Sequence, residues 1–398
     1  MRILLLSVYL IFTHHILNAQ QIEVGELKPF VNIEKGLYAE AIDSLTQLIN
    51  SDNNTYFLNA RINAFIKVND LDKALNDCEL LKKKQKGSAA ILQARIYLLK
   101  NDISNAEKAL LNNLKSTDKI LLYELLTDTD FRKIQDSEFI DSILKTNIYS
   151  STEKQIYKVE KYIKNGNYNE AFFLANEIIN RNPNIADAYY LLSKINLYNS
   201  EFKSAKLNID NAILLRSSDI NFYLQRITIN QKISENSEVL SDVNKLLRLN
   251  PYKSDFYLLK AEALLTNSEF DKAIEQVDFY LELYPQNPDA FYIKASSYFQ
   301  KGENLDALKC INESLENKKT IRQFELRGDI YTKIGTYQFA EIDYSMALDL
   351  DARQGELWAK KGFARYQSGN KTGACSDWRK GKRYGSLLSI EYLEKYCK

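Results

Sequence analysis

Apolar residues recur at helical spacing along almost the whole chain, in paired runs separated by short polar breaks. The segment FYIKASSYFQKGENLDALKCINESLE (291–316) is typical, because a helical run is followed by Lys-Gly-Glu-Asn and then by a second helical run. This pattern predicts two antiparallel helices joined by a tight turn. One such hairpin cannot bury both apolar faces alone, so each hairpin must stack on a neighbour.

The hairpins repeat with a nearly constant period of 32 to 34 residues, apart from one longer step between Ala106 and Ala171. The alanines that open each second run are Ala41, Ala74, Ala106, Ala171, Ala205, Ala273, Ala307, Ala340 and Ala374, with Val239 in the one gap. Just ahead of each stands a turn residue, in order Gly36, Asn69, Asn101, Gly166, Ser200, Ser234, Ser268, Gly302, Gly335 and Gly369. A turn this tight needs a residue that tolerates positive φ. Self-similarity at a fixed period predicts an all-α solenoid.

Composition removes several classes of function. The two histidines, His14 and His15, lie in the N-terminal apolar segment, and a chain that loses this segment has no Ser-His-Asp site, Cys-His site or His-ligated metal. No Gly-rich phosphate-binding loop is present. With 53 basic and 52 acidic residues, the charge gives no reason to expect nucleic acid as a partner. We therefore expect no enzyme activity, no cofactor and no metal.

The first 20 residues, MRILLLSVYLIFTHHILNAQ, have the layout of a secretory signal peptide. One positive charge precedes an apolar run, and the small Ala19 stands before the polar Gln20. The apolar run is too short to span a bilayer. We expect residues 1–19 to be removed on export, most simply to a periplasm, and no later segment has the length of a membrane span.

The repeat resembles the tetratricopeptide repeat (TPR), which has a 34-residue period, an aromatic residue at position 4, small residues at positions 8 and 20, and Pro at position 32. Position 4 holds Tyr189, Tyr223, Tyr257, Phe291, Phe324 and Trp358, and position 8 holds Ser193, Ala261, Ala295, Gly328 and Gly362. Seven units match in register, at 152–185, 186–219, 220–253, 254–287, 288–320, 321–354 and 355–388. The resemblance implies a right-handed superhelical solenoid of antiparallel helix pairs.

Three looser repeats occupy residues 20–120, and Pro29 should leave the first helix of this group short or broken. Residues 121–151 read either as a degenerate repeat or as a connector. We expect two helices there, separated by Thr-Asp-Thr-Asp at 127–130. The expected organisation is thus a signal peptide (1–19), an N-terminal array (20–120), this segment (121–151), a C-terminal array (152–388) and the rest of a capping helix (389–398).

Two of the four cysteines lie close to the C-terminus. Cys375 follows Ala374 in the last repeat, and Cys397 ends a further helix, near 386–396, that should cap the open end of the solenoid. In an oxidising compartment these two thiols should form a disulfide. The segment also resembles the ends of other exported TPR proteins, which close with Gly-Ala-Cys-x-Asp-Trp and a final Tyr-Cys. Cys78 and Cys310 lie in distant repeats and are expected to be free.

Resemblance to TPR proteins implies that the first helix of each repeat lines a concave groove where partner segments bind. Repeat positions 2, 5, 9, 12 and 13 should face this groove. The candidate binding residues are Tyr190, Lys194, Tyr198, Leu258, Glu262, Tyr292, Phe299, Phe363 and Tyr366. For each aromatic residue of this set, the alternative is that its ring packs against a neighbouring residue of the solenoid and does not contact a partner.

We expect a non-catalytic scaffold of the cell envelope that binds a partner protein or peptide. Two alternatives remain open: a carbohydrate- or cell-wall-binding module that uses the aromatic groove, and a structural subunit that associates with itself. Aromatic residues beside paired carboxylates would favour carbohydrate, whereas an apolar groove would favour a peptide.

Overall fold

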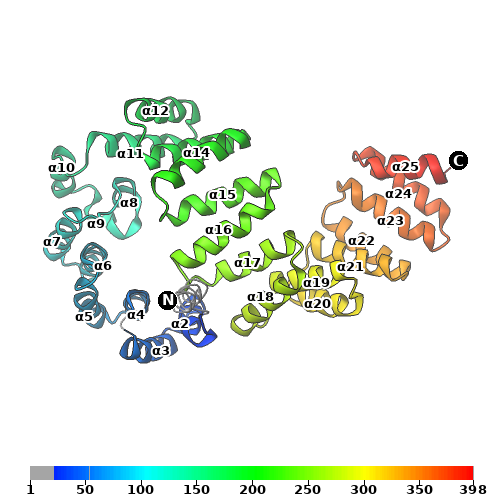
Figure 1. Cartoon of the computed structure of the whole chain (residues 1–398), viewed down its shortest axis with the longest axis horizontal. Helices are drawn as coiled ribbons and strands as arrows, with labels where there is room; N and C mark the ends of the chain where they lie inside the picture. Colours follow the sequence, from blue (N-terminus) through cyan, green and yellow to red (C-terminus); the bar gives the residue numbers. More distant parts are fainter. Residues whose placement is uncertain (1–21, 53, 398) are drawn as a thin grey trace, which may run out of the picture. The chain divides into compact units, whose positions relative to one another are not determined.

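The protein is described here by a computed structural model that covers residues 22–52 and 54–397. The described residues form a series of helices joined by short turns and contain no strand, which confirms the predicted all-α solenoid (Figure 1). Contacts divide the chain into two compact units, Met1–Ser254 (unit 1) and Asp255–Lys398 (unit 2). The expected signal peptide, 1–19, lies outside the described residues. No helix in the described ranges has the length and apolar character needed to cross a bilayer.

Unit 1 is a row of hairpins with one irregular segment. Its helices are α2 (Val24–Glu34), α3 (Tyr38–Ser51), α4 (Thr55–Lys67), α5 (Leu71–Lys82), α6 (Lys86–Leu99), α7 (Ile103–Leu114), α8 (Leu122–Thr127), η1 (Thr129–Phe131), α9 (Arg132–Gln135), α10 (Glu138–Lys145), α11 (Ser151–Lys164), α12 (Tyr168–Arg181), α13 (Ala186–Tyr198), α14 (Phe202–Leu215), α15 (Ile220–Ile233) and α16 (Asn236–Leu249). Pro29 lies inside α2, which stays unbroken but is only 11 residues long.

Unit 2 contains four hairpins and one terminal helix. Its helices are α17 (Asp255–Thr266), α18 (Phe270–Leu283), α19 (Pro288–Lys301), α20 (Asn304–Asn317), α21 (Ile321–Lys333), α22 (Tyr337–Leu350), α23 (Gly355–Gln367), α24 (Lys371–Arg383) and α25 (Leu387–Tyr396). The odd-numbered helices from α17 to α23 open the hairpins, and the even-numbered ones close them.

All ten predicted turn residues have positive φ, which confirms their role. The five non-glycine members, Asn69, Asn101, Ser200, Ser234 and Ser268, have φ between 59° and 61°. At the Gly302 turn, the Glu303 amide donates to the Tyr298 carbonyl at 2.9 Å and the Gly302 amide donates to the Phe299 carbonyl at 3.0 Å. These two bonds close the end of α19 and reverse the chain into α20.

Small residues let the two helices of a hairpin approach closely. A Cβ atom added to Gly328 of α21 would lie 2.6 Å from the ring of Tyr344 in α22, and one added to Gly362 of α23 would lie 2.4 Å from Trp378 in α24. Both rings are almost fully buried. The recurring alanines, such as Ala340, are also fully buried. The residues at positions 8 and 20 are therefore small because the backbones meet there.

A recurring arginine joins consecutive second helices. Arg327 of α21 donates two bonds to Asp343 of α22, at 2.7 and 2.8 Å, and a third to Asn312 of α20 at 2.8 Å. Arg226 of α15 bonds in the same way to the second helices before and after it, and Arg61 of α4 does so too. Each guanidinium thus holds two second helices side by side.

Residues 121–151 form shorter pieces than the two helices expected. α8 ends at Thr127, as predicted from the Thr-Asp-Thr-Asp run, but the second helix is divided into η1, α9 and α10. The Ser137 hydroxyl accepts from the Ile140 amide and starts α10 as a new helix. The buried side chains of this segment share one core with α6 and α7, so it packs as part of the wall of unit 1.

The chain ends with a capping helix, as predicted. α25 packs on α24, and Trp378 is fully buried among Tyr366, Tyr392 and Tyr396. Cys375 and Cys397 form the predicted disulfide, with their Cα atoms 5.8 Å apart. The other two thiols, Cys78 and Cys310, are free and buried, as expected.

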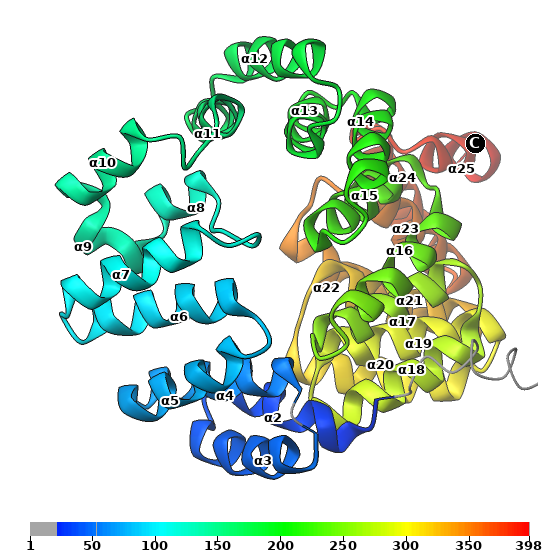
Figure 2. The same cartoon turned by 60° about the vertical axis from the view of Figure 1, so that its left-hand side comes forward.

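Unit 1 closes on itself through a contact that the repeat pattern does not indicate. Tyr252, in the turn after α16, is stacked on a ring of α2 and meets two rings of α4, and Figures 1 and 2 both show α2 beside this turn. The Tyr56 hydroxyl donates to the Leu249 carbonyl at 2.6 Å. We call this the closing contact; its members are Phe30, Glu34, Tyr56, Phe57, Leu249, Tyr252 and Ser254.

Two substitutions test the turn geometry in opposite directions. Gly302→Ala should lower the free energy of unfolding by about 1 kcal/mol, because alanine is strained at φ +82° although no neighbouring atom blocks its side chain. Ser268→Gly should raise it by about 0.5 kcal/mol, because φ there is already +61°. Urea denaturation followed by circular dichroism measures both. A loss of stability in Ser268→Gly would contradict the assignment.

Removing one arginine bridge should be costly. Arg327→Ala leaves Asp343, whose side chain is 2% exposed, without its cation, and should lower the free energy of unfolding by about 3 kcal/mol. The control is Arg353→Ala, an exposed arginine paired with Asp351, which should cost less than about 0.5 kcal/mol. Equal losses in the two variants would show that the bridge contributes no more than a surface ion pair.

Candidate functional site

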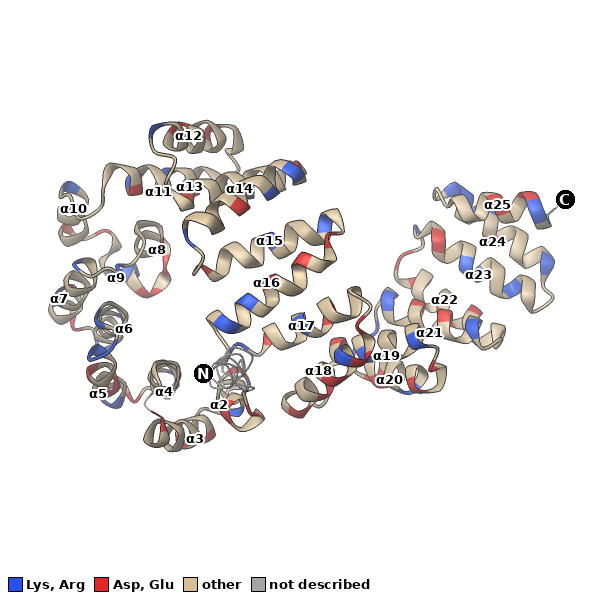
Figure 3. Ribbon diagram, viewed as in Figure 1, with Lys and Arg blue, Asp and Glu red and all other residues tan. Residues whose placement is uncertain are grey.

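The first helices of unit 1 form the inner side of its curved wall. In Figure 1, α4, α6 and α8 lie inside α5 and α7, and Figure 3, in the same view, shows α13 inside α12. We call the face formed by α4, α6, α8, α11, α13 and α15 the inner wall. Three open cavities lie along it, of about 430 Å³ at α13–α15, about 330 Å³ at α8–α11 and about 290 Å³ at α6–α8.

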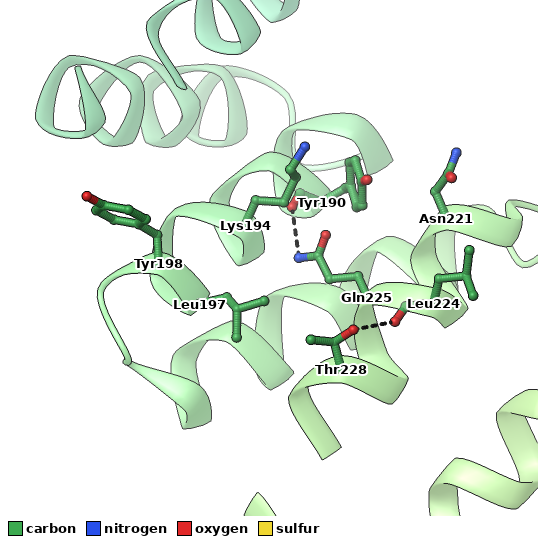
Figure 4. Close-up of a pocket in the computed structure, with 8 residues that line it drawn as sticks. All are labelled: Tyr190, Lys194, Leu197, Tyr198, Asn221, Leu224, Gln225 and Thr228. Atoms are coloured by element: carbon green, nitrogen blue, oxygen red, sulfur yellow. Dashed lines mark hydrogen bonds between the residues drawn. The ribbon is translucent and has the colours of Figure 1, made fainter. Parts of the chain in front are cut away.

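The α13–α15 cavity brings together three predicted binding residues, Tyr190, Lys194 and Tyr198 (Figure 4). They share one face of α13 because their spacing is close to one and two helical turns. On α15, Leu224 and Thr228 stand 34 residues after Tyr190 and Lys194, so the repeat places them on the equivalent face. The remaining lining residues are Leu197, Asn221 and Gln225.

This cavity combines exposed apolar surface with one positive charge. Tyr198 is 64% exposed although it stacks on Tyr168 with ring centroids 3.7 Å apart. The Lys194 ammonium lies 5.4 Å from the centre of the Tyr190 ring. Within residues 22–52 and 54–397, no ion pair is found for Lys194. Such a surface suits a ligand that carries an apolar group next to a carboxylate.

Three carboxyl groups, those of Glu153, Glu160 and Asp187, line the α8–α11 cavity. Burial raises the pKa of Glu160 to about 7, and Asp187 and Glu124 add to the rise, whereas Lys194 opposes it. The other two carboxylates in the lining are paired, Glu153 with Lys119 at 2.9 Å and Asp187 with Arg216. Tyr123 and Tyr157 line the same cavity, with ring centroids 6.5 Å apart.

The repeat positions that were assigned to the groove also point to this second cavity. Ile156 and Glu160 occupy positions 5 and 9 of the unit 152–185, the positions that Tyr190 and Lys194 occupy in the next unit. The lining from 121–123 had no such signal, because that segment lacks the repeat pattern. The binding role of all these residues remains a prediction.

In unit 2 the other predicted binding residues are more involved in packing. Tyr292 and Phe299 are partly buried against the core formed by α19 to α23, and Leu258 packs on the core of α17 to α19. Glu262 is exposed on α17.

The capping helix meets the last two candidates. Phe363 is stacked on Tyr392 of α25 with ring centroids 5.8 Å apart. Tyr366 lies 4.5 Å from the ring of Tyr396 and 5.9 Å from that of Trp378. Part of the surface that these two rings would offer to a partner is therefore used inside the protein.

Comparison with known proteins agrees with the repeat geometry. A family model described as tetratricopeptide repeat matches residues 258–319. Among solved structures, a tetratricopeptide repeat protein from Parabacteroides merdae is 19% identical over 63% of this chain and 100% of that chain, with a TM-score of 0.53. A comparison with curated proteins finds no match.

Two further solved structures are similar over different lengths. The APC/C hetero-tetramer Cut9–Hcn1 is 13% identical over 93% of this chain and 89% of that chain, with a TM-score of 0.47. YrrB, a TPR protein with an unusual peptide-binding site, is 17% identical over 46% of this chain and 92% of that chain, with a TM-score of 0.40. Residues 258–319 therefore match the tetratricopeptide repeat, and the chain has the fold of a tetratricopeptide-repeat protein.

Proposed function

We propose that this protein is a non-catalytic scaffold of the cell envelope that holds a segment of a partner protein on the inner wall of unit 1. Tetratricopeptide-repeat proteins are commonly protein-interaction scaffolds. The observation that carries the proposal is the α13–α15 cavity, where exposed Tyr198 and Leu224 flank Lys194, a cation without an ion pair among the described residues. Exposed aromatic rings are frequent anchors at protein interfaces.

The chemistry of the wall defines the segment that it fits. An apolar side chain would cover Tyr198 and Leu224, and a carboxylate next to it would pair with Lys194. One repeat earlier, Glu160, which a pKa of about 7 leaves partly protonated at neutral pH, would hydrogen-bond a polar residue of the same segment or lose its proton to pair with a basic one. Because the closing contact brings the first hairpin of unit 1 against its last turn, a narrow segment, extended or helical, suits the wall better than a folded domain.

The envelope location rests on two features. The layout of residues 1–19 is that of a secretory signal peptide. The Cys375–Cys397 disulfide is of the kind that persists in oxidising compartments. Proteins with a signal peptide can be exported to a periplasm, and a periplasm is oxidising, so this compartment agrees with both features.

The carbohydrate-binding alternative calls for aromatic rings beside paired carboxylates. In the α8–α11 cavity, Glu153 and Asp187 already pair with Lys119 and Arg216, which leaves Glu160 beside the tyrosines. The α13–α15 cavity offers a lysine and side-chain amides instead. A protein segment is therefore the ligand we propose.

Photo-cross-linking in intact cells tests the surface. A photoreactive amino acid at Tyr198 should cross-link a defined envelope protein, and the same group at Leu214, which is 83% exposed on α14, should not. With that partner purified, Lys194→Glu should weaken binding at least about tenfold, because it replaces attraction by repulsion. Leu214→Glu is the matched control and should leave binding unchanged. Equal cross-linking at both positions, or full binding by Lys194→Glu, would contradict the proposal.

The pKa of Glu160 makes stability depend on pH. Its folded-state pKa of about 7 lies above the ordinary value of 4.5, so the folded protein holds an extra proton between these values and loses stability as pH rises from 4.5 to 7. Glu160→Gln should therefore raise the free energy of unfolding at pH 8 and have little effect at pH 4.5. Denaturation at the two pH values measures this. An equal effect at both would show that Glu160 titrates normally.

A further inference from the structure

We propose that two copies of this chain associate through the outer face of unit 2, with α22 of one copy packed against α22 of the other. The two-fold axis lies between the two helices and runs parallel to them. This association goes beyond the proposed function, because its contact surface lies on the second helices of the hairpins in unit 2 and not on the inner wall of unit 1. The inference starts from an exposed apolar stripe on α22. Its members are Phe339, Ile342, Met346 and Leu350, which are 56%, 53%, 48% and 54% exposed.

The stripe follows the helical period. Its residues are spaced by three, four and four positions, so they lie in one row along the helix. The other exposed residues of α22 are Gln338 and Asp349. An exposed row of large apolar side chains on a regular helix marks an interaction surface.

The neighbouring second helices carry mostly polar or charged residues at the positions of Ile342 and Met346. Counting from the buried alanine of each unit, Ile342 corresponds to Glu275 in α18, Lys309 in α20 and Ser376 in α24. Met346 corresponds to Phe279 in α18, Glu313 in α20 and Lys380 in α24. Hairpins of this fold therefore stack without an apolar residue at these positions, and among the second helices of unit 2 only α22 carries such an exposed row.

Charge on the two sides of the stripe is opposite. α20 carries three acidic side chains against one lysine, and α18 carries further acidic residues (Figure 3). On the other side, α24 carries five exposed basic residues, Lys371, Arg379, Lys380, Lys382 and Arg383, and its one acidic residue, Asp377, is buried.

Two arginines fix the order of these helices. Arg327 bonds to both α20 and α22. Arg365 of α23 bonds to Glu341 of α22 at 2.7 Å and pairs with Asp377 of α24 at 2.9 Å. The stripe therefore lies between an acidic helix and a basic one.

This arrangement is complementary to itself in one orientation. A two-fold axis along α22 places α20 of each copy opposite α24 of the other, so acidic residues meet basic ones on both sides of the stripe. An axis across α22 would place α20 against α20 and α24 against α24, which opposes like charges. A closed two-fold contact buries the same surface on both copies, and like charges disfavour the second orientation.

Sedimentation equilibrium of the purified chain tests the association. The wild-type chain should form a dimer at micromolar concentration. The double variant Ile342→Lys, Met346→Glu gives α22 the residues that α20 holds at the same positions, and it should be monomeric up to about 100 μM. Leu214→Lys, which changes a leucine that is 83% exposed on the outer helix α14, should dimerise like the wild type. Unchanged helical circular dichroism shows that each variant is folded.

A charge exchange tests the orientation of the axis. Arg379→Glu, Arg383→Glu on α24 should weaken the dimer at least about tenfold, and so should Asp306→Lys, Glu313→Lys on α20. An equimolar mixture of the two variants should restore dimers that contain one copy of each. A monomeric wild-type chain, a dimer that survives the stripe substitutions, or a mixture that stays monomeric would each overturn the proposal. None of these results bears on the inner wall.

Discussion

Each hairpin depends on one close approach between its two helices. In the last two hairpins, a large buried ring of the second helix lies over a glycine that has no room for a side chain, as Tyr344 does over Gly328 and Trp378 over Gly362. Other hairpins have small residues at the same repeat position, among them Ser193, Ala261 and Ala295. This approach fixes the angle and distance between the helices of a pair. Because the same approach recurs in successive repeats, the hairpins are alike and stack with nearly constant geometry.

A constant geometry leaves the faces of the helices free to vary. Positions 5 and 9 of consecutive repeats face the same side, so the inner wall presents Ile156 and Glu160, then Tyr190 and Lys194, and then Leu224 and Thr228. Outside, the same rule places an apolar row on α22 and charged residues at the matching positions of α20. The framework is therefore common to all repeats, whereas recognition resides in the few positions that the packing does not fix.

The local features could be predicted from the sequence because each depends on neighbouring residues. The positive φ of ten turns, the capping helix and the Cys375–Cys397 disulfide followed from short-range patterns and from the compartment expected for the chain. The division of residues 128–145 into three pieces was missed, because the hydroxyl of Ser137 starts a new helix where the apolar spacing alone suggested continuity.

Contacts between distant repeats could not be predicted in this way. The stacking of Tyr252 on Phe30 joins residues separated by more than six repeats, and it depends on the accumulated curvature of the wall. For the same reason, the sequence did not show that the capping helix meets Phe363 and Tyr366, two of the predicted binding residues. Their spacing was correct for a groove, but their exposure depends on what the C-terminus covers.

In the function proposed for this protein, the inner wall of unit 1, and not its outer helices, receives the partner. Hydroxyl-radical footprinting of the free and partner-bound chain measures this directly, because it reports the solvent exposure of individual side chains. The account predicts that Tyr190, Tyr198 and Leu224 become protected in the complex, whereas Phe173 of α12 and Leu214 of α14, both exposed on outer helices, react as before. Protection of Phe173 and Leu214 with no change at the inner wall would contradict it.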